Sequence, residues 1–121
     1  MQETNFERLQ VYQLAEDLSD RIWTTVSAWD HFVRSTVGNQ IVRAADSVGA
    51  NIAEGLGRGS TQDTRRFVRI ARGSLYEVKH WLKRVKCRNL MPESELNSLF
   101  QLMAELLPKL NAYLASLDRK C

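Results

Sequence analysis

The feature that most constrains the fold of this chain is the spacing of its apolar residues, which recur every three or four positions through four long segments. This spacing places the apolar side chains of each segment on one side of an α-helix. Only two prolines and six glycines occur in 121 residues, so little interrupts the pattern. No alternating apolar run is flanked by the turn dipeptides of a β-hairpin. The sequence therefore predicts an all-α protein.

The four predicted helices are joined by short connections. They cover residues 6–29, 37–56, 61–87 and 93–117. Short connections make consecutive helices antiparallel, so we expect an antiparallel up-down-up-down four-helix bundle that forms a single domain over residues 1–121. In the third helix, the residues expected to face the core are Phe67, Ala71, Ser74 or Leu75, Val78, Leu82 and Val85.

Hydroxyl and carboxylate side chains mark the expected starts of two helices. Ser35 and Thr36 are the N-cap candidates of the second helix, and Ser60 is the expected N-cap of the third. Asp63 falls in the first turn of the third helix, where a negative charge interacts favourably with the helix dipole.

Glycine and proline mark the expected irregularities of the helices. Gly49 lies inside the second helix, where it costs about 1 kcal/mol relative to alanine, so we expect another helix to pack closely there. Residues 55–59 contain three glycines, which suit a left-handed C-cap after the second helix. Pro108 lacks the backbone N–H that would bond to the carbonyl of Ala104, so we expect the fourth helix to kink there.

Nothing in the sequence indicates a disulfide, a metal site or a membrane segment. Cys87 and Cys121 have no partner at metal-site spacing and are expected to be free thiols in a reducing compartment. The two histidines, His31 and His80, stand alone in the sequence. The chain starts without the basic and apolar stretches of a signal peptide, and no apolar run approaches the ~20 residues of a membrane span. We expect a cytoplasmic protein without cofactor, metal or small-molecule substrate.

Positive charge is concentrated in the third predicted helix. The chain has a net charge of +3, but residues 58–88 hold ten Lys or Arg against two acids, and the remaining residues are net negative. Six of these bases recur at helical spacing and form what we call the basic stripe: Arg65, Arg69, Arg72, Lys79, Lys83 and Lys86. The stripe is ~30 Å long, contains no acid, has Tyr76 in its one gap, and is expected to point away from the core.

A row of cations on one helix face suits a phosphate backbone, because each contact releases condensed counterions. Arg58, in the loop before the helix, is expected to add a contact. A solvated helix face would normally mix both signs, since like charges four positions apart repel. We therefore predict a non-enzymatic scaffold that binds RNA or DNA, RNA being preferred, through phosphates with little base readout. The alternative is an interaction adaptor or structural oligomer whose basic stripe meets an acidic protein partner.

A line of polar residues along the second predicted helix has two interpretations. Arg43, Ser47, Asn51 and Glu54 are spaced by four, four and three positions. Glu54 could act as the general base of an enzyme, but no second carboxylate or histidine joins the line. Buried polar groups need partners, so we interpret the line as a hydrogen-bonded polar seam between helices and predict no catalytic residue.

Three stretches resemble the motifs of one bacterial family. They are LQVYQLA at residues 9–15, QIVRAADSVGANIAEG at residues 40–55 and FVRIARGSLYE at residues 67–77. Together they resemble the four-helix-bundle proteins encoded in intervening sequences of 23S ribosomal RNA genes. Pro108 in the last helix departs from the family pattern.

The resemblance implies a cytosolic, non-enzymatic protein that assembles as a ring-like homopentamer. A looser similarity extends to the accessory proteins of diversity-generating retroelements, which are basic pentamers that bind nucleic acid and a reverse transcriptase. On this resemblance the polar seam is a structural signature within or between subunits. A basic stripe repeated around a ring would make a concentrated positive surface.

Overall fold

Helices make up almost all of the chain from residue 9 to residue 120, the part that the computed structural model describes. In chain order they are α2 (Gln10–Ser27), α3 (His31–Val33), the π-helical turn η1 (Arg34–Gly38), α4 (Asn39–Leu56), α5 (Thr61–Cys87) and α6 (Glu93–Lys120). No strand occurs among these residues, which confirms the predicted all-α class. The predicted start of the first helix at residue 6 and the thiol of Cys121 lie outside the described residues.

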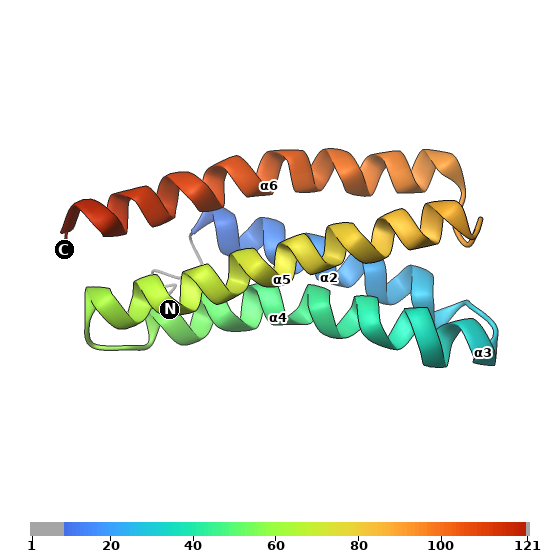
Figure 1. Cartoon of the computed structure of the whole chain (residues 1–121), viewed down its shortest axis with the longest axis horizontal. Coiled ribbons are helices and arrows are strands. Elements are labelled where there is room, and N and C mark those ends of the chain that lie inside the picture. Colours follow the sequence, from blue (N-terminus) through green and yellow to red (C-terminus); the bar gives the residue numbers. More distant parts are fainter. Residues whose placement is uncertain (1–8, 121) are drawn as a thin grey trace, which may run out of the picture.

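The elements α3, η1 and α4 follow one another without a break and form one helical rod (Figure 1). This rod is longer than the second predicted helix, which covers residues 37–56. Asp30 is its N-cap, and its carboxylate accepts a hydrogen bond of 3.2 Å from the backbone N–H of Val33. Ser35 and Thr36 lie inside η1, where both hydroxyls donate to carbonyls of the preceding turn. The prediction that they cap the helix is therefore wrong. Local propensity did not reveal the π-helical turn that continues the rod.

The four long helices pack as an antiparallel bundle (Figure 1). α4 packs against α2 and α5, and α6 packs against α5 and α2. α2 and α5 therefore occupy opposite corners of the bundle. This arrangement confirms the predicted up-down-up-down architecture.

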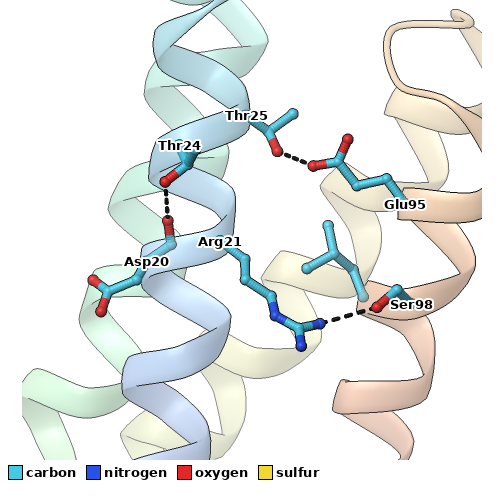
Figure 2. A pocket seen from close by; sticks show the side chains of 7 residues that line it. Asp20, Arg21, Thr24, Thr25, Glu95 and Ser98 are labelled. Carbon is cyan, nitrogen blue, oxygen red and sulfur yellow. Dashed lines mark hydrogen bonds between the residues drawn. The ribbon is translucent and has the colours of Figure 1, made fainter.

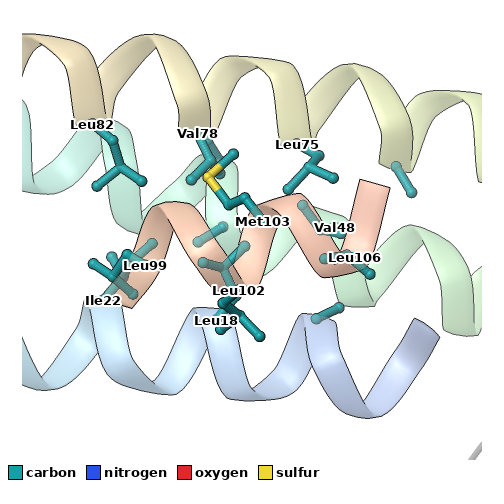
Figure 3. Packing of buried hydrophobic residues seen from close by; sticks show 14 of the residues in the cluster. Leu18, Ile22, Val48, Leu75, Val78, Leu82, Leu99, Leu102, Met103 and Leu106 are labelled. Carbon is teal, nitrogen blue, oxygen red and sulfur yellow. The ribbon is translucent and has the colours of Figure 1, made fainter. Parts of the chain in front are cut away.

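The core consists of aliphatic side chains from all four long helices. Leu18 and Ile22 of α2, Val78 of α5 and Leu99 of α6 point into the common interior and are almost completely buried (Figure 3). Each fully buried side chain of this size stabilises the fold by about 1.5–3 kcal/mol. The core thus holds the four helices together.

The buried side of α5 differs from the predicted one at its first turns. Thr64 and Val68 are buried there, whereas Phe67 is only half-buried and turns toward α4. The later predicted core residues are buried, from Ala71 to Val85. Ser60 is the N-cap as predicted, and its hydroxyl accepts a 3.1 Å hydrogen bond from the backbone of Asp63.

Gly55 serves packing rather than a helix cap. A Cβ added at Gly55 would lie 3.0 Å from the Cβ of Phe67 and 3.1 Å from the carbonyl oxygen of Thr64, so its absence allows α4 and α5 to approach closely. The C-cap of α4 is Gly57, with a right-handed φ of −80°. The predicted left-handed glycine cap is therefore wrong; among the described residues, no glycine has a positive φ.

Two other expectations concern the interior of the helices. Gly49 packs against α2, where an added Cβ would lie 3.8 Å from the Cβ of Ala15, which agrees with the expected close neighbour. The second expectation is a kink of the fourth helix at Ala104, four positions before Pro108. α6 remains helical through Pro108 and curves gently in its second half (Figure 1).

Between residues 9 and 120, no helix has both the length and the apolarity needed to span a membrane.

Candidate nucleic-acid interface

The basic stripe follows the edge of α5 that borders α6. Each stripe residue comes one position after a buried residue, as Arg69 follows Val68 and Lys83 follows Leu82. One position is a rotation of about 100° around the helix axis. The stripe therefore lies beside the buried face and not opposite to it, which corrects the expected orientation. The predicted core residues from Ala71 to Val85 are indeed buried and already precede the later stripe residues by one position, so the angle of about 100° follows from the sequence itself.

The arginine half of the stripe bonds to α6. The guanidinium groups of Arg65 and Arg69 lie 3.5 Å and 3.4 Å from the same carboxylate oxygen of Asp118. Arg72 donates a 3.1 Å hydrogen bond to the side-chain oxygen of Asn111. The side chain of Arg65 is only 24% exposed. An acid is therefore present at the stripe after all, and it comes from a helix distant in the sequence.

The lysine half of the stripe keeps its charge exposed. Lys79, Lys83 and Lys86 are exposed, and no ion pair involves them within the described part of the chain. Tyr76, 52% exposed, lies one turn before Lys79 on the same edge. Lysine ammonium groups without a nearby carboxylate are the more available cations for a polyanion.

Arg58 lies apart from the stripe. Its guanidinium makes a 2.6 Å ion pair with Glu54 and stands over the ring of Phe67 at 4.9 Å from the ring centre. Arg66 approaches the same ring at 5.1 Å. Since Phe67 is on the α4 side of α5, Arg58 belongs to that side, whereas the stripe borders α6. The structure thus does not bring Arg58 together with the other predicted contact residues.

The predicted polar seam divides into two parts. The hydroxyls of Ser47 and Ser74 lie 2.8 Å apart and join α4 to α5, and the side-chain amide of Asn51 donates to the Ser47 hydroxyl at 2.9 Å. Glu54 instead turns to Arg58, and Arg43 is exposed. Ser47 and Asn51 therefore form an inter-helix hydrogen-bond network, while the two charged members stand on the surface.

A second surface feature is the cleft between α2 and α6, with a volume of about 410 Å³ (Figure 2). Arg21 of α2 donates a 3.0 Å hydrogen bond to the hydroxyl of Ser98 on α6, and Thr25 bonds to Glu95. These contacts join the two helices across the cleft. No histidine or cysteine lines it, and no group of three or more metal-ligating side chains occurs among the described residues.

A family model described as 23S rRNA-intervening sequence protein matches residues 7–112. The chain belongs to this family. A solved structure from Bacteroides thetaiotaomicron VPI-5482, described as a protein with unknown function from the S23 ribosomal protein family, has the same fold. It is 21% identical, has a TM-score of 0.77, and the match covers 86% of this chain and 97% of that one. Among curated proteins, none matches the sequence.

Membership of the 23S rRNA-intervening sequence family confirms the resemblance inferred from the three motifs. Two of these motifs meet where α4 packs against α5. The hydrogen-bonded hydroxyls of Ser47 and Ser74 come one from each motif, and so do Gly55 and Phe67, which lie in close contact. The residues that carry the family resemblance therefore build the helix pair that presents the basic stripe.

The partners of the arginines are what sequence reasoning missed. Asp118 is 49 positions after Arg69, and Asn111 is 39 positions after Arg72. The antiparallel pairing of α5 and α6 brings these residues together. The one signal in the sequence was that Asn111 and Asp118 are seven positions apart, which places both on one face of a helix.

Proposed function

We propose that the protein is a non-enzymatic, cytoplasmic RNA-binding scaffold that contacts phosphates through the basic stripe. The observation that carries the proposal is the row of Lys79, Lys83 and Lys86, exposed and without a paired carboxylate in the described chain. Neutralisation of phosphates by such a row releases counterions and binds nucleic acid with little dependence on base sequence.

The two halves of the stripe contribute unequally in this proposal. Arg65 and Arg69 must exchange the carboxylate of Asp118 for a phosphate, so the net gain from each is reduced. The lysines lose only water and counterions. We therefore expect charge reversal at Lys83 to weaken binding more than charge reversal at Arg65.

The test is fluorescence anisotropy with a structured RNA and a DNA of matched sequence, measured over a series of salt concentrations. The wild-type protein should show a steep loss of affinity with salt. The double variant Arg69→Glu, Lys83→Glu should bind every sequence more weakly and reduce the slope of log K against log salt by roughly 0.7–0.9 per lost phosphate contact. Arg43→Glu, an exposed base outside the stripe, makes the same change of charge as Lys83→Glu alone and is the matched control for that single variant. Equal weakening by this control, or unchanged affinity of the double variant, refutes the proposal.

One observation favours a second candidate function, an adaptor for an acidic protein. Arg65 and Arg69 pair with a carboxylate in the folded chain, so the stripe can bind this group, and a partner's carboxylate would replace that of Asp118. Affinity purification before and after nuclease treatment separates the two functions. A protein partner retained after nuclease treatment supports the adaptor, and loss of all partners supports the RNA scaffold.

We also propose that the protein assembles as a homo-oligomer, a pentamer as the family resemblance implies. Two large apolar side chains support association, because Trp23 is 61% and Phe32 is 74% exposed. Trp23 lies at an apolar groove of about 440 Å³ between α2 and the rod formed by η1 and α4. Val42 of α4 also lines this groove. Native mass spectrometry of the wild type and of Trp23→Ser tests this assembly. A wild-type monomer at all concentrations excludes it.

A further inference from the structure

A small apolar hollow lies between α5 and α6, in the gap between the two halves of the basic stripe. Its volume is about 150 Å³. Phe100, Met103 and Leu107 of α6 form one wall, and Tyr76 and Lys79 of α5 form the other. The hollow is thus apolar inside and has a cation beside an exposed aromatic ring at its edge.

The hollow has the size of one aromatic ring. A protein cavity of about 150 Å³ lined by apolar side chains accommodates benzene. Tyr76, on the α5 wall, is 52% exposed, and Phe100, on the α6 wall, is half-buried, so part of each side chain is accessible from solvent. A planar ring that enters the hollow would contact both side chains. Such contacts are the usual means by which proteins hold unstacked nucleobases.

The charges around the hollow complement phosphates that flank such a base. Lys83 and Lys86 follow Lys79 on the same edge of α5, about 6 Å and 10 Å further along the helix axis. In the other direction Arg72 is hydrogen-bonded to Asn111, a neutral group. Cations on both sides of an aromatic-lined hollow suit a strand that continues past a single inserted base.

We infer that the hollow between α5 and α6 binds one unpaired base of a single-stranded RNA, which stacks on Tyr76 while the lysines contact the adjoining phosphates. The inference rests on the proposed RNA-binding function and adds the substrate class. Bases in a duplex are stacked and paired, so only a single-stranded segment, loop or bulge presents one to the hollow. Electrostatics alone favours the duplex, since its phosphates are more densely spaced and its counterion release is larger.

The experiment compares a 12-nucleotide unstructured RNA with the same strand annealed to its complement. The wild-type protein should bind the single strand more tightly at equal salt. Tyr76→Ala should weaken single-strand binding by roughly tenfold, the effect expected from loss of one stacked base. Its duplex affinity and the salt slope should stay unchanged, because no charge is removed. Tyr76→Phe keeps the ring and should bind as the wild type does.

A second variant fills the hollow without touching Tyr76 or a charge. Ala104 lies exposed at the hollow on α6, so Ala104→Met should fold normally and weaken single-strand binding selectively. Circular dichroism and thermal denaturation verify the fold of each variant. If Ala104→Met is unfolded, the single-strand affinity of Tyr76→Ala by itself tests the base site.

The outcomes separate this inference from the function on which it rests. If Lys83→Glu weakens both RNA forms while Tyr76→Ala weakens neither, the scaffold function stands and the base site is refuted. Tighter binding of the duplex by the wild-type protein also refutes it. If neither RNA form binds in a salt-dependent manner, the proposed function itself fails.

Discussion

Replacement of Gly55 by alanine tests whether the close approach of α4 and α5 is a requirement of the fold. The new methyl group would lie 3.0 Å from the Cβ of Phe67, 3.1 Å from the carbonyl oxygen of Thr64 and 3.4 Å from its Cα. The last two atoms belong to the backbone of α5, which cannot move aside as a flexible side chain does. The Thr64 hydroxyl also donates a 2.7 Å hydrogen bond to the carbonyl of Gly55, so separating the helices lengthens a buried hydrogen bond.

The magnitude follows from three opposing contributions. Alanine gains about 1 kcal/mol over glycine inside a helix. Overpacking of a closely packed contact costs about 1–3 kcal/mol. Weakening of the hydrogen bond from Thr64 costs about a further 1 kcal/mol. We therefore expect Gly55→Ala to lower the free energy of unfolding by about 1–3 kcal/mol, which for a domain of this size lowers the melting temperature by roughly 4–10 °C.

The matched control is the same substitution in the same helix. At Gly49 the new methyl group would meet Ala15 at 3.8 Å and Tyr12 at 3.9 Å, both ordinary van der Waals distances. Gly49→Ala should therefore raise the free energy of unfolding by roughly 0.5–1 kcal/mol. Urea denaturation followed by circular dichroism, at one protein concentration, measures both variants. If Gly55→Ala stabilises the protein as Gly49→Ala does, our account of the α4–α5 contact is wrong.

Two further predictions concern charge and pH. Asp118→Asn removes the carboxylate that holds Arg65 and Arg69, so the affinity for RNA at low salt should rise several-fold and the slope of log K against log salt should steepen. The control Asp17→Asn, on α2, should change neither quantity. Weaker RNA binding by Asp118→Asn would contradict this prediction. Burial raises the pKa of Tyr113 above its ordinary value, so the folded chain holds this proton more tightly than the unfolded chain. Its contribution is therefore complete below pH ~10 and is lost as the pH rises through the folded-state pKa. Urea denaturation from pH 8 to pH 11 should show a smaller alkaline loss for Tyr113→Phe, and parallel curves would count against this prediction.

Features that depend on neighbours within one helix followed directly from the sequence. The helical spacing of apolar residues predicted the class and the four long helices, and Ser60 marked the start of α5 at the correct residue. These features are local, because an N-cap acts within one turn and an amphipathic face repeats every 3.6 residues. The same periodicity placed Arg65, Arg69 and the lysines on one edge of α5.

Local signals were insufficient where the connection between helices was unusual. The segment after α2 contains hydroxyl residues that favour a helix start at Ser35 or Thr36, yet the rod begins directly after Asp30 and passes through η1. Asp30, Ser35 and Thr36 all have the side-chain oxygen that an N-cap needs. The rod begins directly after Asp30, and the buried Val37 and Gly38 of η1 pack against α2, the helix that precedes it.

The sequence by itself determined that this chain forms amphipathic helices, that they assemble as a bundle, and that one helix carries a continuous row of cations. Only the tertiary structure decided what those cations meet. It brings Asp118 to Arg65 and Arg69, leaves Lys79, Lys83 and Lys86 exposed, and opens a hollow beside Tyr76. The physical reason is that charge spacing along a helix is set by its own backbone. The partners of those charges are set by the antiparallel register of α5 against α6, which the core side chains of both helices determine together.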